Sequence, residues 1–119
     1  MNKQRVLFLC THNSARSQMA EGFLRAMAGD RFDAQSAGTE KTPVNPLFAG
    51  LMHEPWDHLI TVCDDANERC PFVPGTQKRL HWSFEDPSRA SGSDENRLAT
   101  FRRVRDQIEA RLADWIETR

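Results

Sequence analysis

The sequence contains no tyrosine and only three cysteines among its 119 residues. Three is an odd number, and it is too few for the disulfide frameworks that hold small secreted domains together. No apolar run approaches the roughly 18 residues of a membrane-spanning helix. The apolar stretch at 6–9 is also too short for a signal peptide. These absences exclude secreted-scaffold and membrane classes. They predict a cytoplasmic protein, in which cysteines are more often catalytic than structural.

Charge of either sign is not in excess. The chain has 16 Lys and Arg against 17 Asp and Glu, for a formal net charge of -1. This balance gives no electrostatic reason to expect binding to nucleic acid or to an anionic membrane. With 39% hydrophobic residues, a chain of this length buries a real core rather than staying disordered. We therefore expect a single domain over residues 1–119, and a monomer.

Short apolar runs alternate with amphipathic stretches along the chain. Strands are predicted over 5–9, 31–37, 58–63 and 79–84. Helices are predicted before Gly29, over 45–52 and from Ser93 onward. This succession predicts an α/β fold in which helices flank a four-stranded parallel sheet. Ligands of such sheets bind beyond the carboxyl ends of the strands, and Cys10 and Cys63 each stand at such an end.

Two of the predicted helices, the one before Gly29 and the one from Ser93 onward, have an apolar face. Ser93 is a good N-cap for the latter helix, because its hydroxyl can accept a hydrogen bond from the first turn. The apolar residues at helical spacing are Met19, Ala20, Phe23, Leu24 and Met27 in the first helix, and Leu98, Phe101, Val104, Ile108, Leu112, Trp115 and Ile116 in the second.

The loop after the first strand combines a nucleophile with features of an anion site. Its successive backbone N–H groups form a nest, and the following helix adds its positive end. A thiol placed there, as Cys10 is, has a pKa below its usual range. Arg16 has the geometry to grip two oxygens of a tetrahedral oxyanion. The residues expected to bind the oxyanion are Thr11, His12, Asn13, Ser14, Ala15, Arg16 and Ser17.

A Cys and an Arg six positions apart also occur by chance, as a buried cysteine and a solvated arginine. The context favours a site, because an apolar strand precedes the loop and an amphipathic helix follows it. The Cys-x5-Arg-Ser pattern at Cys10–Ser17 resembles the low-molecular-weight protein tyrosine phosphatase superfamily. That superfamily also uses a late Asp-Pro pair as general acid, a role the resemblance assigns to Asp86. Taken alone, Asp86-Pro87 is a common turn former.

Two further cysteines, Cys63 and Cys70, separate this chain from ordinary phosphatases, which need only one. A zinc site usually requires four ligands at tighter spacing. Core packing explains Cys63 at a strand end, but it explains Cys70 badly, because polar residues 67–69 precede it. The pair therefore indicates redox chemistry.

The chain resembles the thioredoxin-coupled arsenate reductases of this superfamily over nearly all of its length. The resemblance implies that Cys10 attacks arsenate and that Asp86 protonates the departing oxygen. It also implies a relay, in which a Cys10–Cys63 disulfide releases arsenite and a Cys63–Cys70 disulfide is then reduced by thioredoxin, in arsenic detoxification. The matching stretches are 14–22, 36–39, 44–46, 61–64, 70–71, 81–87 and 101–106.

The resemblance also raises the question of a metal cofactor. Asn13, Glu21 and Ser36 match positions that form a structural potassium site in some relatives. A further acidic ligand would come from a segment that this chain lacks: relatives carry roughly twenty more residues between about Met52 and Trp56. We therefore expect no cofactor, with potassium as the open alternative.

Two other functions stay open at this point. The first is a phosphatase for phosphotyrosine or aryl phosphates. Against it, Asp86-Pro87 is followed by Ser88, where tyrosine-specific relatives often place an aromatic residue. The second is a non-catalytic oxyanion-binding redox sensor, which the shortened segment makes plausible.

Overall fold

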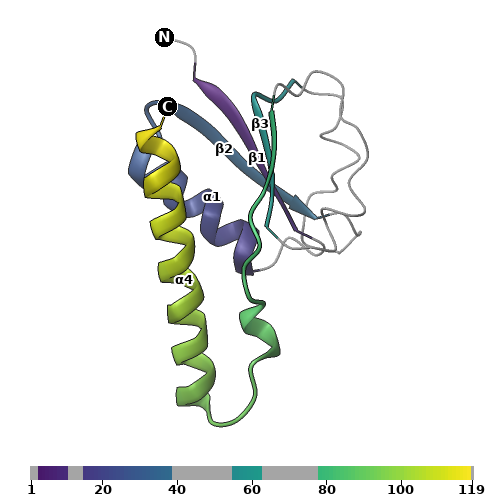
Figure 1. Cartoon of the computed structure of the whole chain (residues 1–119), viewed down its shortest axis with the longest axis vertical. Helices are drawn as coiled ribbons and strands as arrows, with labels where there is room; N and C mark the ends of the chain where they lie inside the picture. The colour runs from purple at the N-terminus through teal and green to yellow at the C-terminus, as the bar shows by residue number, and fades with distance from the viewer. Residues whose placement is uncertain (1–2, 11–14, 39–54, 63–77, 119) are drawn as a thin grey trace.

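The computed structural model describes residues 3–10, 15–38, 55–62 and 78–118. In these ranges the four predicted strands are present, together with the helices predicted before Gly29 and from Ser93 onward (Figure 1). The helix expected over 45–52 lies outside the described residues. The elements are β1 (Gln4–Cys10), α1 (Ala15–Ala28), β2 (Phe32–Gly38), β3 (His58–Thr61), β4 (Lys78–His81), the 3₁₀ turn η1 (Pro87–Arg89) and α4 (Asp94–Glu117).

The four strands form one parallel sheet in the order β2-β1-β3-β4, which confirms the predicted architecture. β1 is central: it pairs with β2 over its whole length, and Val6 to Leu9 pair with β3. Successive residues of a strand point to opposite faces of the sheet. Because all four side chains from Val6 to Leu9 are completely buried, both faces of β1 are covered. The apolar run at 6–9 is the sequence signature of such a strand.

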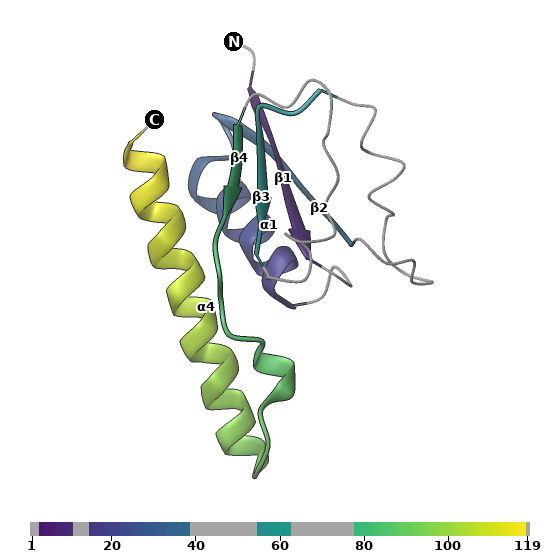
Figure 2. The same ribbon diagram turned by 45° about the vertical axis from the view of Figure 1, so that its right-hand side comes forward.

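The third and fourth strands have shorter described pairing than predicted. β4 is an edge strand whose one neighbour in the sheet is β3, and their register stops where Thr61 pairs with His81. The N–H of Trp82 donates one more bond to the Thr61 carbonyl, at 2.8 Å. Beyond it the chain leaves the sheet and runs toward η1 and α4 (Figure 2). The prediction that the fourth strand continues to Phe84 was therefore wrong, because no partner strand is present there among the described residues.

The two α-helices pack side by side against one face of the sheet (Figures 1 and 2). α1 buries a stripe of residues four apart, Ala20, Leu24 and Ala28. Met27 and Leu98 were expected in the core, but they are 41% and 49% exposed. Met27 lies beside this stripe rather than on it. Leu98 belongs to the first turns of α4, which extend past the end of the sheet (Figure 1).

The long helix α4 begins as the sequence predicts. The Ser93 hydroxyl accepts a hydrogen bond from the N–H of Asn96 at 3.1 Å, and Asp94 and Glu95 lie in the first turn. Acidic side chains there interact favourably with the positive end of the helix. α4 is also amphipathic, and within the described ranges no helix is long and apolar enough to cross a membrane. Its buried face is made by Thr100, Val104, Ile108, Leu112 and Trp115.

An aromatic cluster joins the end of α4 to the sheet. The Trp115 ring lies edge-on to His58 of β3, with centroids 5.0 Å apart, and 5.1 Å from the Phe32 ring of β2. Trp82, just after β4, is 6.0 Å from it. Aromatic pairs in such tilted arrangements add stability beyond the area they bury. The cluster fixes the position of α4 on the sheet. It thereby also limits where the segment between β4 and α4 can lie.

Because the core side of α4 is tightly packed, Leu112→Ala is expected to lower the free energy of unfolding by about 2–5 kcal/mol. The matched control is Leu98→Ala, which makes the same change on the exposed side of the same helix. It is expected to change stability by less than about 0.5 kcal/mol. Urea unfolding followed by tryptophan fluorescence measures both values. Equal losses in the two variants would contradict this assignment of the helix faces.

Candidate active site

Cys10 lies at the carboxyl edge of the sheet. Cys10 is the last residue of β1, is 1% exposed, and pairs with Gly38 of β2. α1 begins only five residues later, at Ala15. A strand therefore precedes the predicted anion loop and a helix follows it, as expected. Thr11, His12, Asn13 and Ser14 lie outside the described residues, so the nest geometry stays a prediction.

Three of the predicted oxyanion residues, Ala15, Arg16 and Ser17, lie in the first turn of α1. Ser17 is completely buried, and only 12% of the Arg16 side chain is exposed. Arg16 is directed toward the segment that follows β4. Its Nη1 donates to the Phe84 carbonyl at 3.0 Å, and its Nη2 lies 3.5 Å from Oδ2 of Asp86. The buried Nε of Arg16 has no hydrogen-bond acceptor among the described residues.

Asp86 lies between two guanidinium groups. Its Oδ2 is 3.5 Å from Arg16 Nη2 and 3.6 Å from Nε of Arg89, while its own side chain is 24% exposed. The Asp-Pro pair also forms a turn, since the Arg89 N–H donates to the Asp86 carbonyl at 3.3 Å and the Ala90 N–H donates to Pro87 at 3.2 Å. Asp86-Pro87 is therefore a turn former here, and this is compatible with the expected role of Asp86 as an acid. The turn places the carboxylate beside Arg16.

A second ion pair connects this segment to the long helix. Nη2 of Arg103 on α4 lies 2.7 Å from Oε1 of Glu85, and both side chains are about half exposed. Sequence reasoning identified neither this pair, nor Arg89, nor the carbonyl of Phe84. A backbone carbonyl carries no sequence signal. Arg89 could have been found from the sequence, because it stands three residues after Asp86, the expected acid.

The chain leaves β3 directly beside the end of β1. The N–H of Val62 donates to the Leu9 carbonyl at 2.9 Å, one residue before Cys10. Thr61, at the same edge, bonds through Oγ1 to Nδ1 of His81 at 2.7 Å. Val62 is the last described residue of this stretch, and Cys63 and Cys70 lie outside the described residues. The structure therefore places Val62, the residue before Cys63, beside the end of β1.

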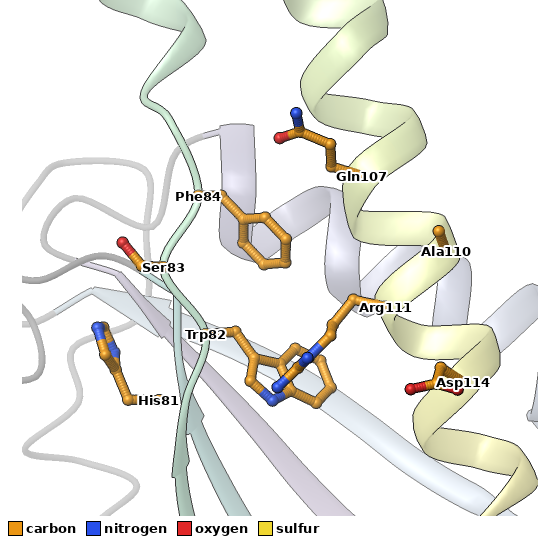
Figure 3. Close-up of a pocket in the computed structure, with 8 residues that line it drawn as sticks. All are labelled: His81, Trp82, Ser83, Phe84, Gln107, Ala110, Arg111 and Asp114. Carbon is orange, nitrogen blue, oxygen red and sulfur yellow. The ribbon is translucent and has the colours of Figure 1, made fainter.

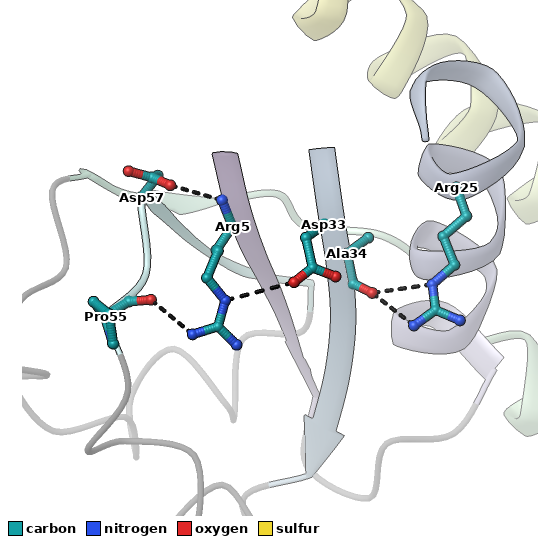
Figure 4. Close-up of polar contacts among 6 residues, drawn as sticks. All are labelled: Arg5, Arg25, Asp33, Ala34, Pro55 and Asp57. Carbon is teal, nitrogen blue, oxygen red and sulfur yellow. Dashed lines mark hydrogen bonds and ion pairs between the residues drawn. The ribbon is translucent and has the colours of Figure 1, made fainter. Parts of the chain in front are cut away.

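Glu21 and Ser36, two of the three residues matched to a potassium site, contact each other. The Ser36 hydroxyl donates to Glu21 Oε1 at 2.8 Å, and Arg25 Nη1 lies 3.5 Å from Oε2. Arg25 also donates through Nε and Nη2 to the carbonyl of Ala34, at 3.1 and 2.9 Å (Figure 4). Each Glu21 oxygen thus has a protein partner already. In the described part of the chain no group of three or more His, Cys, Asp or Glu side chains is arranged to hold a metal ion.

A different set of contacts braces the opposite edge of the sheet. There Nη1 of Arg5 donates to the Pro55 carbonyl at 3.1 Å and Nε lies 3.6 Å from Asp33, while the Arg5 N–H donates to Asp57 at 2.7 Å (Figure 4). Arg5 also stacks on Trp56, with 4.1 Å from its guanidinium carbon to the ring centroid. These bonds join the starts of three neighbouring chain segments. They hold the strands in register at the edge away from Cys10.

An open pocket of about 750 Å³ lies between α4 and the segment after β4, lined in part by Trp82, Phe84 and Arg111 (Figure 3). Its lining includes neither Cys10 nor Arg16 nor Asp86. The pocket therefore lies apart from the candidate active site.

Known proteins resemble this chain in sequence and in fold. A family model described as low molecular weight phosphotyrosine protein phosphatase matches residues 5–55. An arsenate reductase of Halalkalibacterium halodurans is 41% identical over 137 residues, covering 99% of each chain. The crystal structure of an arsenate reductase from Archaeoglobus fulgidus superposes with a TM-score of 0.68 at 30% identity, covering 94% of this chain and 98% of that one. A thioredoxin-dependent arsenate reductase of Corynebacterium glutamicum has the same fold, with a TM-score of 0.62 at 24% identity, covering 98% of this chain and 64% of that one.

The sequence comparison also bears on length. An aligned span of 137 residues against a chain of 119 leaves at least 18 positions of the relative without a counterpart here. This agrees with the expected shortfall of roughly twenty residues. Its predicted place, after about Met52, falls within 39–54 and so outside the described residues.

The contact between Arg16 and Asp86 generates a stability prediction. Asp86→Asn is expected to lower the free energy of unfolding by about 1–3 kcal/mol, because the largely buried Arg16 keeps its charge and loses its carboxylate partner. The control is Asp106→Asn, whose exposed partner Arg105 lies 2.9 Å away. That change is expected to stay below about 0.5 kcal/mol. Urea unfolding of both variants decides the matter, and equal losses would count against the contact.

Proposed function

The chain belongs to the arsenate reductase family, within the low-molecular-weight phosphatase superfamily, and we propose that it reduces arsenate to arsenite with Cys10 as nucleophile. The observation that carries this proposal is the meeting of Arg16 and Asp86, 3.5 Å apart, at the sheet edge where Cys10 ends β1. A cation for the oxyanion and an acid for its leaving oxygen thus come from segments far apart in sequence. Nothing about the packing of the core alone requires this pairing.

In the first step the Cys10 thiolate attacks arsenic while Arg16 and the backbone N–H groups of the loop hold the oxyanion. A sulfur–arsenic bond forms and one arsenic–oxygen bond breaks. The departing group is an arsenate hydroxyl: Asp86 takes up a proton from solvent before the step and gives it to this hydroxyl, which leaves as water. Arg16 is already placed beside Asp86, so that the arsenate oxygens it binds are held near the acid.

In the second step we propose that Cys63 attacks the sulfur of Cys10. A disulfide forms, the sulfur–arsenic bond breaks, and its electron pair stays with arsenic, which leaves as arsenite. Support comes from the bond between Val62 and Leu9, because Cys63 is the residue after Val62 and consecutive Cα atoms are about 3.8 Å apart. The start of this segment is therefore close to Cys10.

Cys70 then attacks Cys63, which frees Cys10 and leaves a Cys63–Cys70 disulfide for the reductant. We propose thioredoxin as that reductant, because the Corynebacterium glutamicum protein of the same fold is described as thioredoxin-dependent. The role that follows for the chain is arsenic detoxification. Two electrons enter from the thioredoxin dithiol and two reach arsenic, so the cycle balances.

A phosphatase activity is the second candidate. It is supported by the match of residues 5–55 to the phosphotyrosine phosphatase family model. Phosphate and arsenate have the same shape and charge, so the loop that binds one is expected to bind the other. We expect aryl phosphate hydrolysis as a weak side activity at most.

The test compares two reactions of the full chain. NADPH consumption is followed with thioredoxin, thioredoxin reductase and arsenate, and p-nitrophenyl phosphate hydrolysis is followed in parallel. Arsenate-dependent NADPH oxidation that greatly exceeds the phosphatase rate is expected. Fast aryl phosphate hydrolysis without arsenate turnover would establish the phosphatase, and the absence of both activities would favour an oxyanion-binding redox sensor.

Within the same assay, Cys70→Ser is expected to stop the reaction after about one turnover, because the Cys10–Cys63 disulfide then has no internal thiol to resolve it. Non-reducing peptide mapping should recover that disulfide. Cys10→Ser is the control, with no turnover at all. Steady turnover by Cys70→Ser would show that the proposed relay is wrong.

We propose that this enzyme needs no bound potassium ion. Both oxygens of Glu21 already have protein partners, and one of these partners is the Arg25 guanidinium. This side chain supplies next to Glu21 the positive charge that a metal ion would bring. Activity and the unfolding midpoint are expected to be the same in potassium chloride and in choline chloride at equal ionic strength. A rise of either that is specific to potassium would contradict this.

A further inference from the structure

We propose that Arg89 is a second oxyanion-binding residue, at the mouth of the active site. The substrate class is a tetrahedral oxyanion of one to two negative charges, such as arsenate or phosphate. This inference rests on the function proposed above and deepens it. Arg89 was not named from the sequence; its contact with Asp86 in the structure identifies it.

The first argument is the sharing of one carboxylate oxygen by two guanidinium groups. Oδ2 of Asp86 is 3.5 Å from Arg16 Nη2 and 3.6 Å from Arg89 Nε. One negative charge thus stands between two positive ones. The nearby carboxylate of Glu85 is paired with a cation of its own, Arg103, at 2.7 Å. The cluster of Arg16, Asp86 and Arg89 therefore carries one excess positive charge.

The second argument is what the proposed reaction demands of this charge. Cys10 reacts as a thiolate, and the incoming arsenate is itself an anion. Arg16 is the cation expected to offset both, and before substrate binds it is already paired with the carboxylate of Asp86. The excess charge of Arg89 offsets part of this negative charge, at the side of the cluster that faces solvent.

The third argument is the difference in exposure. The Arg16 side chain is 12% exposed, whereas that of Arg89 is 88% exposed. An ion pair as exposed as that of Arg89 with Asp86 contributes little to stability. An oxyanion can therefore replace Asp86 as the partner of the Arg89 guanidinium at a small cost in free energy. It would accept hydrogen bonds from two N–H groups of that guanidinium. An exposed cation at a site entrance also attracts anions from solution, an effect that salt screens.

The fourth argument is that the backbone fixes Arg89 relative to the acid. It is the last residue of η1, the turn closed by the bond from its own N–H to the Asp86 carbonyl at 3.3 Å. Pro87, between them, is buried. Arg89 thus has a defined starting point beside Asp86, and only its side chain has to move to reach a bound oxyanion.

The decisive variant is Arg89→Gln, which keeps much of the side-chain length and removes the charge. In the thioredoxin-coupled assay, KM for arsenate is expected to rise about five- to tenfold while kcat stays within about twofold, the pattern of lost binding rather than lost chemistry. The Kd of inorganic phosphate, measured by titration calorimetry, should rise by a similar factor. The dependence of kcat/KM on ionic strength should flatten.

Two further variants make the result specific. Arg89→Lys keeps the charge without the fork of the guanidinium, and should recover part of the loss. Arg105→Gln makes the same charge change on α4, where Arg105 pairs with its neighbour Asp106; it should leave KM and the phosphate Kd unchanged. Since Arg89 is largely exposed, the unfolding midpoint of its variants should equal that of the unaltered protein.

The outcomes distinguish the proposed role of Arg89 from the proposed reduction of arsenate. If the unaltered protein reduces arsenate and Arg89→Gln changes neither KM nor the phosphate Kd, the inference is overturned and the function stands. A fall in kcat at constant KM would also overturn it, since Arg89 would then act by positioning Asp86. If the unaltered protein reduces no arsenate but Arg89→Gln weakens phosphate binding, the proposed function fails and the oxyanion site stands.

Discussion

Parallel pairing of β1 with a neighbour on each side is the constraint on which the rest of the structure depends. It requires that both faces of the strand be covered, which explains four consecutive buried apolar residues at 6–9. Because all the pairings are parallel, the carboxyl ends of the four strands also lie at the same edge of the sheet. Cys10 therefore ends β1 at the edge where Val62 follows β3 and where β4 ends at His81. Strand register alone thus brings Cys10 close to Val62, the residue before Cys63.

The remaining parts of the site depend on how α4 packs. The aromatic contacts of Trp115 hold this helix against the sheet, and the chain between β4 and α4 must then pass the start of α1. Arg16 bonds to the carbonyl of Phe84 and contacts Asp86 there. A turn of ordinary Asp-Pro type is thus held beside Arg16, because the core fixes where it lies. If Asp86 has the proposed role, stability and function depend on the same contacts at this point.

Arginine side chains supply the positive charge on both halves of α1 and beside it. Arg25 pairs with Glu21 in the second half of α1, and Arg89 pairs with Asp86 beside Arg16 at its start. A guanidinium carries its charge at any physiological pH and offers several donors in one plane. The chain also lacks at least 18 positions that its relative from Halalkalibacterium halodurans has, and a cation carried on a turn close to the acid is unaffected by such a loss.

The sequence by itself determined the α/β class, the four parallel strands, the cap at Ser93 and Cys10 at a strand end, because periodicity, caps and apolar runs are encoded within a few neighbouring residues. It named Arg16 as a functional residue from the loop after the first strand, and Asp86 only through the family resemblance. Their contact across 70 positions of sequence, the exposure of Leu98 and the place of Arg89 were decided by the tertiary structure. The physical reason is that these features depend on strand register and on the docking of α4. Both are set by the summed packing of residues far apart in the chain, which no local pattern records.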